Sequence, residues 1–150
     1  MDEFNTIEKV KKLFSDKNIK DDESNIYLAL LSDSRKNSGM VGGMEYPYNG
    51  LLLCITNDGI GYYYLKTTKF SLKVTMNKLV LDKDSYTFIE NNNIKSIEVK
   101  KFALLDKKRK ELIIKTNDKK THYLYGSVDD NTISYHNDNM NKLILKCSEK

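Results

Sequence analysis

Hydrophobic and polar positions alternate in short runs from residue 50 onward, and the sequence ends in one amphipathic stretch. The apolar runs cover residues 51–56, 60–65, 70–75, 86–89, 94–102, 112–116 and 121–125. Turn residues separate these runs, most clearly Asn57, Asp58 and Gly59, and again at 117–120. Because no helical pattern lies between the runs, they predict an antiparallel meander and a mainly β fold.

The first segment is predicted to be a helix. Its apolar residues recur at helical spacing, with charged residues on the other side. These apolar residues are Phe4, Ile7, Val10, Leu13 and Phe14. Such a helix has one apolar stripe that needs a surface to cover. A polar linker follows at 15–25. The short apolar run 26–31 fits either a strand or the start of a helix, and we favour a strand.

A second helix is predicted to close the chain. One face carries Met140, Leu143, Ile144 and Cys147, and Asn137 or Asp138 is the expected N-cap. We expect this helix to dock across an open end or seam of the sheet. The predicted core is one cluster, made of Leu52, Ile55, Leu72, Val74, Ile97, Val99, Leu112, Ile114, Leu143 and Ile144.

Residues 33–50 have the composition of a long loop. This segment holds four of the seven glycines and the only proline of the chain. A loop of this length inside a compact domain is either functional or disordered. Its apolar residues Met40, Met44 and Tyr46 are therefore candidate contacts for a partner, and we expect the loop to be mobile in the free protein.

Composition and charge narrow the class. A chain of 150 residues fits one domain that can bury its own core. No apolar run is long enough to span a bilayer, and Asp2 and Glu3 stand where a signal peptide would carry basic residues, so we expect a soluble, cytoplasmic protein. Cys54 and Cys147 match no disulfide framework, and we expect both to be reduced thiols.

The net charge of +4 is mild, but residues 100–120 hold a local excess of +6. Its central group is Lys107, Lys108, Arg109 and Lys110. Lysines interleaved with tyrosines suit nucleic acid, which makes nucleic-acid binding an alternative. In an antiparallel meander, however, the loop at 106–110 and the turn at 117–120 lie at opposite ends of the sheet, so this charge is expected to be divided.

No motif in the sequence carries a reaction. His122 and His136 lack a local nucleophile motif, and we expect both to be structural or surface residues. Asp129, Asp130, His136 and Asp138 have metal-ligand side chains, but their spacing matches no known site. We therefore expect no catalytic residues, no metal and no cofactor.

Three segments resemble the bacterial pleckstrin-homology-like (PH-like) family. They are residues 50–57 (GLLLCITN), the tyrosine-rich strand 62–64, and residues 88–100 (FIENNNIKSIEVK). The resemblance implies a partly open antiparallel barrel of about seven strands with a capping C-terminal helix, and it implies no catalytic residues. A phosphoinositide site is not expected, because the loop after the first strand offers at most Arg35 and Lys36.

The sequence thus predicts a helical arm at 1–20 and a PH-like barrel domain at 21–150, acting as a non-catalytic binding or assembly module. A protein partner or self-association is the favoured interpretation. Candidate binding residues are Met40, Met44, Tyr46, Lys107, Lys108, Arg109 and Lys110. The alternative is an anionic membrane surface, which the amphipathic arm would contact, and nucleic acid is the least favoured of the three.

Overall fold

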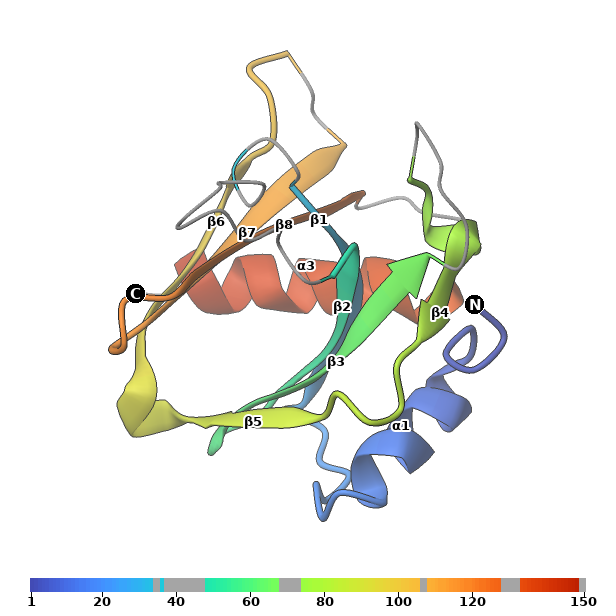
Figure 1. Ribbon diagram of the computed structural model, residues 1–150. Coiled ribbons are helices and arrows are strands. Elements are labelled where there is room, and N and C mark those ends of the chain that lie inside the picture. The colour runs from blue at the N-terminus through green and yellow to red at the C-terminus, as the bar shows by residue number, and fades with distance from the viewer. Residues whose placement is uncertain (34–35, 37–47, 68–73, 106–107, 128–132, 149–150) are drawn as a thin grey trace.

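The computed structural model describes residues 1–33, 36, 48–67, 74–105, 108–127 and 133–148. Within them the protein is mainly β, with one short helix near each end of the chain (Figure 1). The helices are α1 (Ile7–Ser15) and α3 (Ser134–Ser148). The strands are β1 (Ile26–Ser32), β2 (Gly50–Ile55), β3 (Gly59–Thr67), β4 (Leu79–Leu81), β5 (Thr87–Glu90), β6 (Ile94–Lys101), β7 (Arg109–Thr116) and β8 (Thr121–Ser127).

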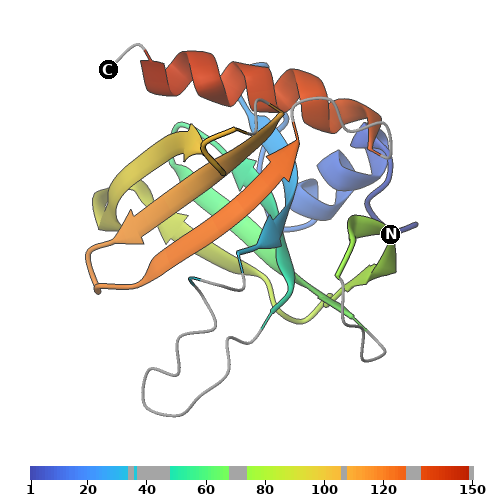
Figure 2. The same ribbon diagram turned by 90° about the horizontal axis from the view of Figure 1, so that it is seen from above.

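The strands form one antiparallel sheet in the order β4-β3-β2-β1-β8-β7-β6, and β5 pairs with the first half of β3. The sheet curls strongly, so that β3 and β5 face β6 and β7 across the interior (Figures 1 and 2). Helix α3 lies across β1 and β6 and covers the opening between them. The predicted mainly β fold, closed by a C-terminal helix and preceded by an N-terminal one, is confirmed.

Inside the curled sheet, alternate residues of each strand meet the apolar face of α3. Leu28 and Leu30 of β1, Leu53 of β2 and Leu112 of β7 are fully buried there. Met140 and Leu143 bring α3 into the same inner cluster, and Ile144 and Cys147 pack against it. Because side chains alternate between the two faces of a strand, the residues between these ones point outward.

A second cluster lies on the outer face of β1 to β4, beneath α1. The ring of Phe14 has its centroid 5.5 Å from that of Tyr63 and 6.1 Å from that of Tyr27. Leu52 is buried in this outer cluster and Val74 packs against it. The prediction of one core cluster is therefore wrong for these two residues, because β2 is buried on both faces. Leu72 lies outside the described residues.

The N-terminal segment is fixed to the sheet by hydrogen bonds as well as by burial. The Tyr63 hydroxyl donates to the carbonyl of Leu13 at 3.1 Å, and the terminal ammonium donates to the carbonyl of Leu79 at 2.7 Å. Phe4, Val10 and Phe14 are completely buried. The apolar stripe of α1 is thus covered by the protein's own sheet.

Two sequence-based boundaries are wrong. The run 70–75 was expected to be a strand. Its residues 70–73 lie outside the described part, Val74 and Thr75 belong to no strand, and β4 begins later, at Leu79. Helix α3 begins at Ser134, so Asn137 and Asp138 lie within it and neither is at its N-cap position. The first turn is held by Tyr135, which is buried in the outer cluster. The apolar face used for the prediction began only at Met140 and did not include that position.

Candidate functional site

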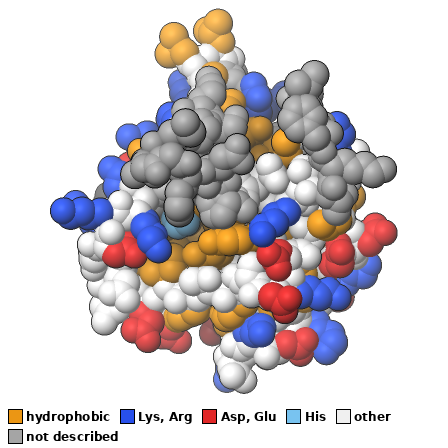
Figure 3. Space-filling view, viewed as in Figure 1, with side chains coloured by type: hydrophobic (Ala, Val, Ile, Leu, Met, Phe, Trp, Pro, Cys, Tyr) orange, Lys and Arg blue, Asp and Glu red, His pale blue; other side chains and the backbone are white. Residues whose placement is uncertain are grey.

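The hairpin between β6 and β7 carries the most exposed large apolar side chains of the described residues. Leu104 is 88% exposed and Leu105 is 92% exposed. Figure 3 shows hydrophobic side chains projecting at the top of the molecule, where Figure 1 places this hairpin. We call these two residues the leucine tip. A single exposed apolar residue is common on protein surfaces. Two adjacent leucines that are both exposed on a projecting hairpin are a stronger indication of a contact surface.

An aromatic stack holds the base of this hairpin. The ring of Phe102, just after β6, stacks on Tyr125 of β8 with centroids 4.4 Å apart. The guanidinium of Arg109 lies over the same Phe102 ring, 4.8 Å from its centroid. Such aromatic and cation–π contacts fix the direction in which the hairpin leaves the sheet.

Exposed cations surround the same base. Lys100 and Lys101 end β6, and Lys108 and Arg109 begin the return along β7. We call these four residues the basic collar. Lys119 and Lys120 lie in the turn at the far end of β7. The charge excess of 100–120 is therefore divided between the two ends of the sheet, as expected from the meander.

Strand β6 is an edge of the sheet. The Phe102 N–H donates to the carbonyl of Arg109 at 3.4 Å, so Phe102 is bonded to the β7 side. Backbone groups alternate along an antiparallel strand, so Glu98 and Lys100 share that side while Val99 and Lys101 direct their N–H and C=O groups away from β7. Among the described residues, β6 pairs with no strand other than β7.

Helix α3 covers only part of this edge. The Cys147 thiol contacts the carbonyl of Ile97 at 3.9 Å, which places the last turn of α3 beside the middle of β6. Beyond Ile97, the outward backbone groups of Val99 and Lys101 continue toward the hairpin. Unpaired edge groups of this kind are a template for pairing with another chain.

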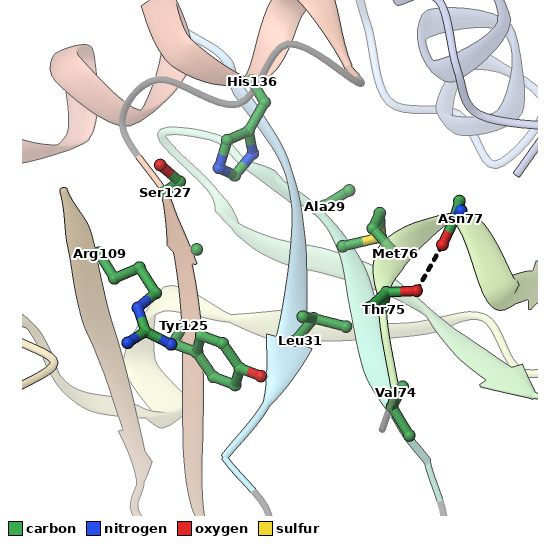
Figure 4. Close-up of a pocket in the computed structure, with 11 residues that line it drawn as sticks. Ala29, Leu31, Val74, Thr75, Met76, Asn77, Arg109, Tyr125, Ser127 and His136 are labelled. Carbon is green, nitrogen blue, oxygen red and sulfur yellow. Dashed lines mark hydrogen bonds between the residues drawn. The ribbon is translucent and has the colours of Figure 1, made fainter. Parts of the chain in front are cut away.

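A cavity of about 480 Å³ lies on the outer face of the sheet, between β8 and the segment 74–77 (Figure 4). Ala29 and Leu31 of β1 form its apolar floor. Figure 4 shows Arg109 and Tyr125 on one side and His136 at the upper end. The cavity thus combines apolar walls with one cation, a composition that suits an amphipathic group carrying a negative charge.

His122 lies inside the curled sheet and bonds through Nδ1 to the Tyr48 hydroxyl. The Tyr48 ring stacks on Tyr64 at 4.7 Å. Burial, aided by the positive charge of Lys120, lowers the pKa of His122 to about 4. A neutral imidazole with only 8% of its surface exposed has the properties of a structural residue.

Two neighbouring acids are buried: Asp33, just after β1, and Glu111, near the start of β7. The Lys36 ammonium donates to Glu111 Oε1 at 2.7 Å. Burial raises the pKa of Glu111; the Lys36 contact opposes this rise and the Asp33 carboxyl adds to it. The three side chains form a compact polar cluster, with Lys36 supplying the positive charge.

Neither cysteine forms a disulfide. Cys54 is completely buried in the outer cluster, and burial raises the pKa of its thiol to about 12. Such a thiol is not an accessible nucleophile. Cys147 is half-buried. In the described part of the chain, no three His, Cys, Asp or Glu side chains come together in a metal-binding arrangement, and Asp129 and Asp130 lie outside it.

The structure places only some of the predicted binding residues. Met40, Met44, Tyr46 and Lys107 lie outside the described residues. Lys108, Arg109 and Lys110 come together at the start of β7, and Arg109 also lines the cavity. Sequence reasoning missed the leucine tip, although two leucines between lysine-flanked strands were visible. It missed the cavity because the walls come from segments far apart in the chain.

No protein-family model, no curated protein and no solved structure matches this chain. Neither helix in the described residues is long and apolar enough to cross a membrane.

Proposed function

We propose that this chain is a non-catalytic, PH-like binding module that engages a protein partner as an extended segment along the open edge of β6. The observation that carries the proposal is the outward direction of the Val99 and Lys101 backbone groups. An extended peptide that pairs with these groups would gain main-chain hydrogen bonds without any change in the sheet.

The charge near this edge favours an acidic partner. Lys100 and Lys101 lie on β6 itself, and Lys146 is exposed in the last turn of α3, which lies beside the middle of β6. Glu98 is the one acid on β6, and its carboxylate lies 3.6 Å from the Lys100 ammonium. Lysines on an edge strand discourage pairing with a second copy of the same strand. They attract a segment rich in Asp or Glu.

Several observations support the PH-like and non-catalytic parts of the proposal. The seven-strand path runs from β4 through β1 to β6, and a C-terminal helix covers its opening, as the family resemblance implies. The buried, neutral His122 and the buried Cys54 thiol are poor candidates for catalysis. Two cysteines without a disulfide favour a reducing compartment, and so a cytoplasmic location.

The test uses peptides selected from a random display library on the folded protein. We expect enrichment of acidic, β-branched sequences, with binding measured by fluorescence polarisation. Lys101→Pro removes an outward N–H that the sheet does not use, so peptide binding should be lost while the melting temperature is kept. Lys101→Ala is the matched control, which removes the charge but keeps the N–H, and it should weaken binding only modestly. Equal binding by Lys101→Pro and Lys101→Ala would refute the edge as the site.

A further inference from the structure

We propose that the hairpin between β6 and β7 is a membrane-insertion element: the leucine tip enters an anionic bilayer while the basic collar lies at the headgroups. This site is separate from the peptide-binding edge, although Lys100 and Lys101 border both. It also differs from the N-terminal arm, whose apolar stripe is already buried against the sheet.

The shape of the hairpin supports insertion. Leu104 and Leu105 are about nine-tenths exposed, and hydrophobic side chains occupy the projecting end of the molecule (Figure 3). The stack of Phe102 on Tyr125, with Arg109 over Phe102, holds the base in place. A rigid base lowers the ordering cost of presenting the two leucines to a surface.

The charges are arranged in the order that a bilayer requires. Both leucines lie beyond the four collar cations along the hairpin, so the apolar groups reach the acyl region first. Glu111, the next acid along β7, is buried and paired with Lys36, so its charge does not face the same surface. Asp106 and Lys107 lie outside the described residues and have opposite formal charges.

The same arrangement of charges disfavours a second copy of the chain as the partner of the leucine tip. Two tips that met about a twofold axis would bring two basic collars together, and their like charges would repel. An anionic bilayer, in contrast, neutralises the collar and covers the leucines in one step. Each basic residue near such a surface contributes about fivefold to the partition coefficient.

The test is sedimentation of the full chain with vesicles of pure phosphatidylcholine and of phosphatidylcholine with 30% phosphatidylglycerol, in roughly 100 mM salt. We expect binding to the anionic vesicles alone. Leu104→Ser with Leu105→Ser should lower the partition coefficient at least tenfold, because burial of each leucine contributes about that factor. Leu145→Ser is the matched control, since Leu145 is an exposed leucine (64%) on α3, and it should bind like the parent.

The collar is tested with Lys101→Gln and Lys108→Gln together, which should lower partitioning by more than tenfold. Lys119→Gln with Lys120→Gln removes the same amount of charge at the opposite end of β7, and this pair should change the partition coefficient less than twofold. The chain contains no tryptophan, so Leu105→Trp adds one depth probe, whose emission should shift to the blue and be quenched by brominated acyl chains.

Three outcomes would overturn the proposal. The first is equal vesicle binding by the leucine-tip variant and the Leu145→Ser control. The second is self-association in the absence of lipid that the leucine-tip substitutions abolish. The third is binding to DNA or RNA that depends on the basic collar but not on the leucines. Loss of peptide binding in Lys101→Pro, with vesicle partitioning equal to that of Lys101→Ala, would separate this site from the β6 edge.

Discussion

The Tyr135 hydroxyl, at the start of α3, donates a hydrogen bond of 2.6 Å to the backbone carbonyl of Phe4. This bond joins the first turn of the closing helix to the N-terminal segment across 131 positions of sequence. Both residues are buried in the outer cluster, together with Phe14 of α1. The N-terminal arm is therefore a structural part of the domain.

The burial of Phe14 predicts a large loss of stability when its ring is removed. Phe14→Ala should lower the free energy of unfolding by about 3 to 5 kcal/mol, because it leaves a cavity among three tyrosine rings. Urea unfolding followed by circular dichroism gives the value. A loss below about 1 kcal/mol would mean that α1 does not pack stably on the sheet.

Helix α3 offers two leucines with opposite expectations. Leu143 is 1% exposed in the inner cluster, so Leu143→Ala should cost about 2 to 5 kcal/mol. Leu145 faces outward on the same helix, and Leu145→Ala should stay within about 0.5 kcal/mol of the parent. Equal stabilities for the two variants would show that α3 does not close the inner cluster.

The depressed pKa of His122 predicts a loss of stability in mild acid. The folded protein holds the pKa near 4, whereas the unfolded chain protonates near 6.5, so the unfolded state binds more protons between these values. The stability that this residue contributes is complete above about pH 6.5 and falls by about 3 kcal/mol as the pH drops to 4. His122→Gln should remove the fall of the urea midpoint between about pH 6.5 and 4. The same fall in the variant and the parent would contradict the role given to His122.

The two cysteines should differ in reactivity. Cys54 is completely buried, with its thiol pKa raised to about 12, and should not react with Ellman's reagent in the folded protein. Cys147, half-buried beside Ile97, should react slowly, and Cys147→Ser should abolish the native reaction. Both thiols should react in denaturant. Fast native reaction in the Cys147→Ser protein would show that the outer cluster opens.

The sequence predicted a helix or strand well where the pattern that specifies it lies within one short segment. The run at 26–31, placed among the strands although periodicity left it open, is β1, and the apolar face around Leu143 predicted α3. The division of the core was not predictable in the same way. Leu51 to Cys54 read as one continuous apolar run, and only the tertiary fold sends Leu52 outward and Leu53 inward.

The candidate site was less accessible to sequence reasoning. The charge of Lys108 and Arg109 was visible, but their position next to Lys100 and Lys101 of the edge strand depends on the pairing of Phe102 with Arg109. The strand order that leaves β6 at an edge is a long-range property, and no local pattern of residues encodes it.

The central claim is that β6 presents an open edge beyond Ile97, and amide hydrogen exchange of the isolated protein tests it most directly. Glu98 and Lys100 bond to β7, so their amides should exchange slowly, whereas Val99 and Lys101 point away and should exchange many times faster. A saturating selected peptide should then protect Val99 and Lys101 and leave Glu98 and Lys100 unchanged. Slow exchange at all four amides in the free protein would contradict the open edge and the function proposed for it.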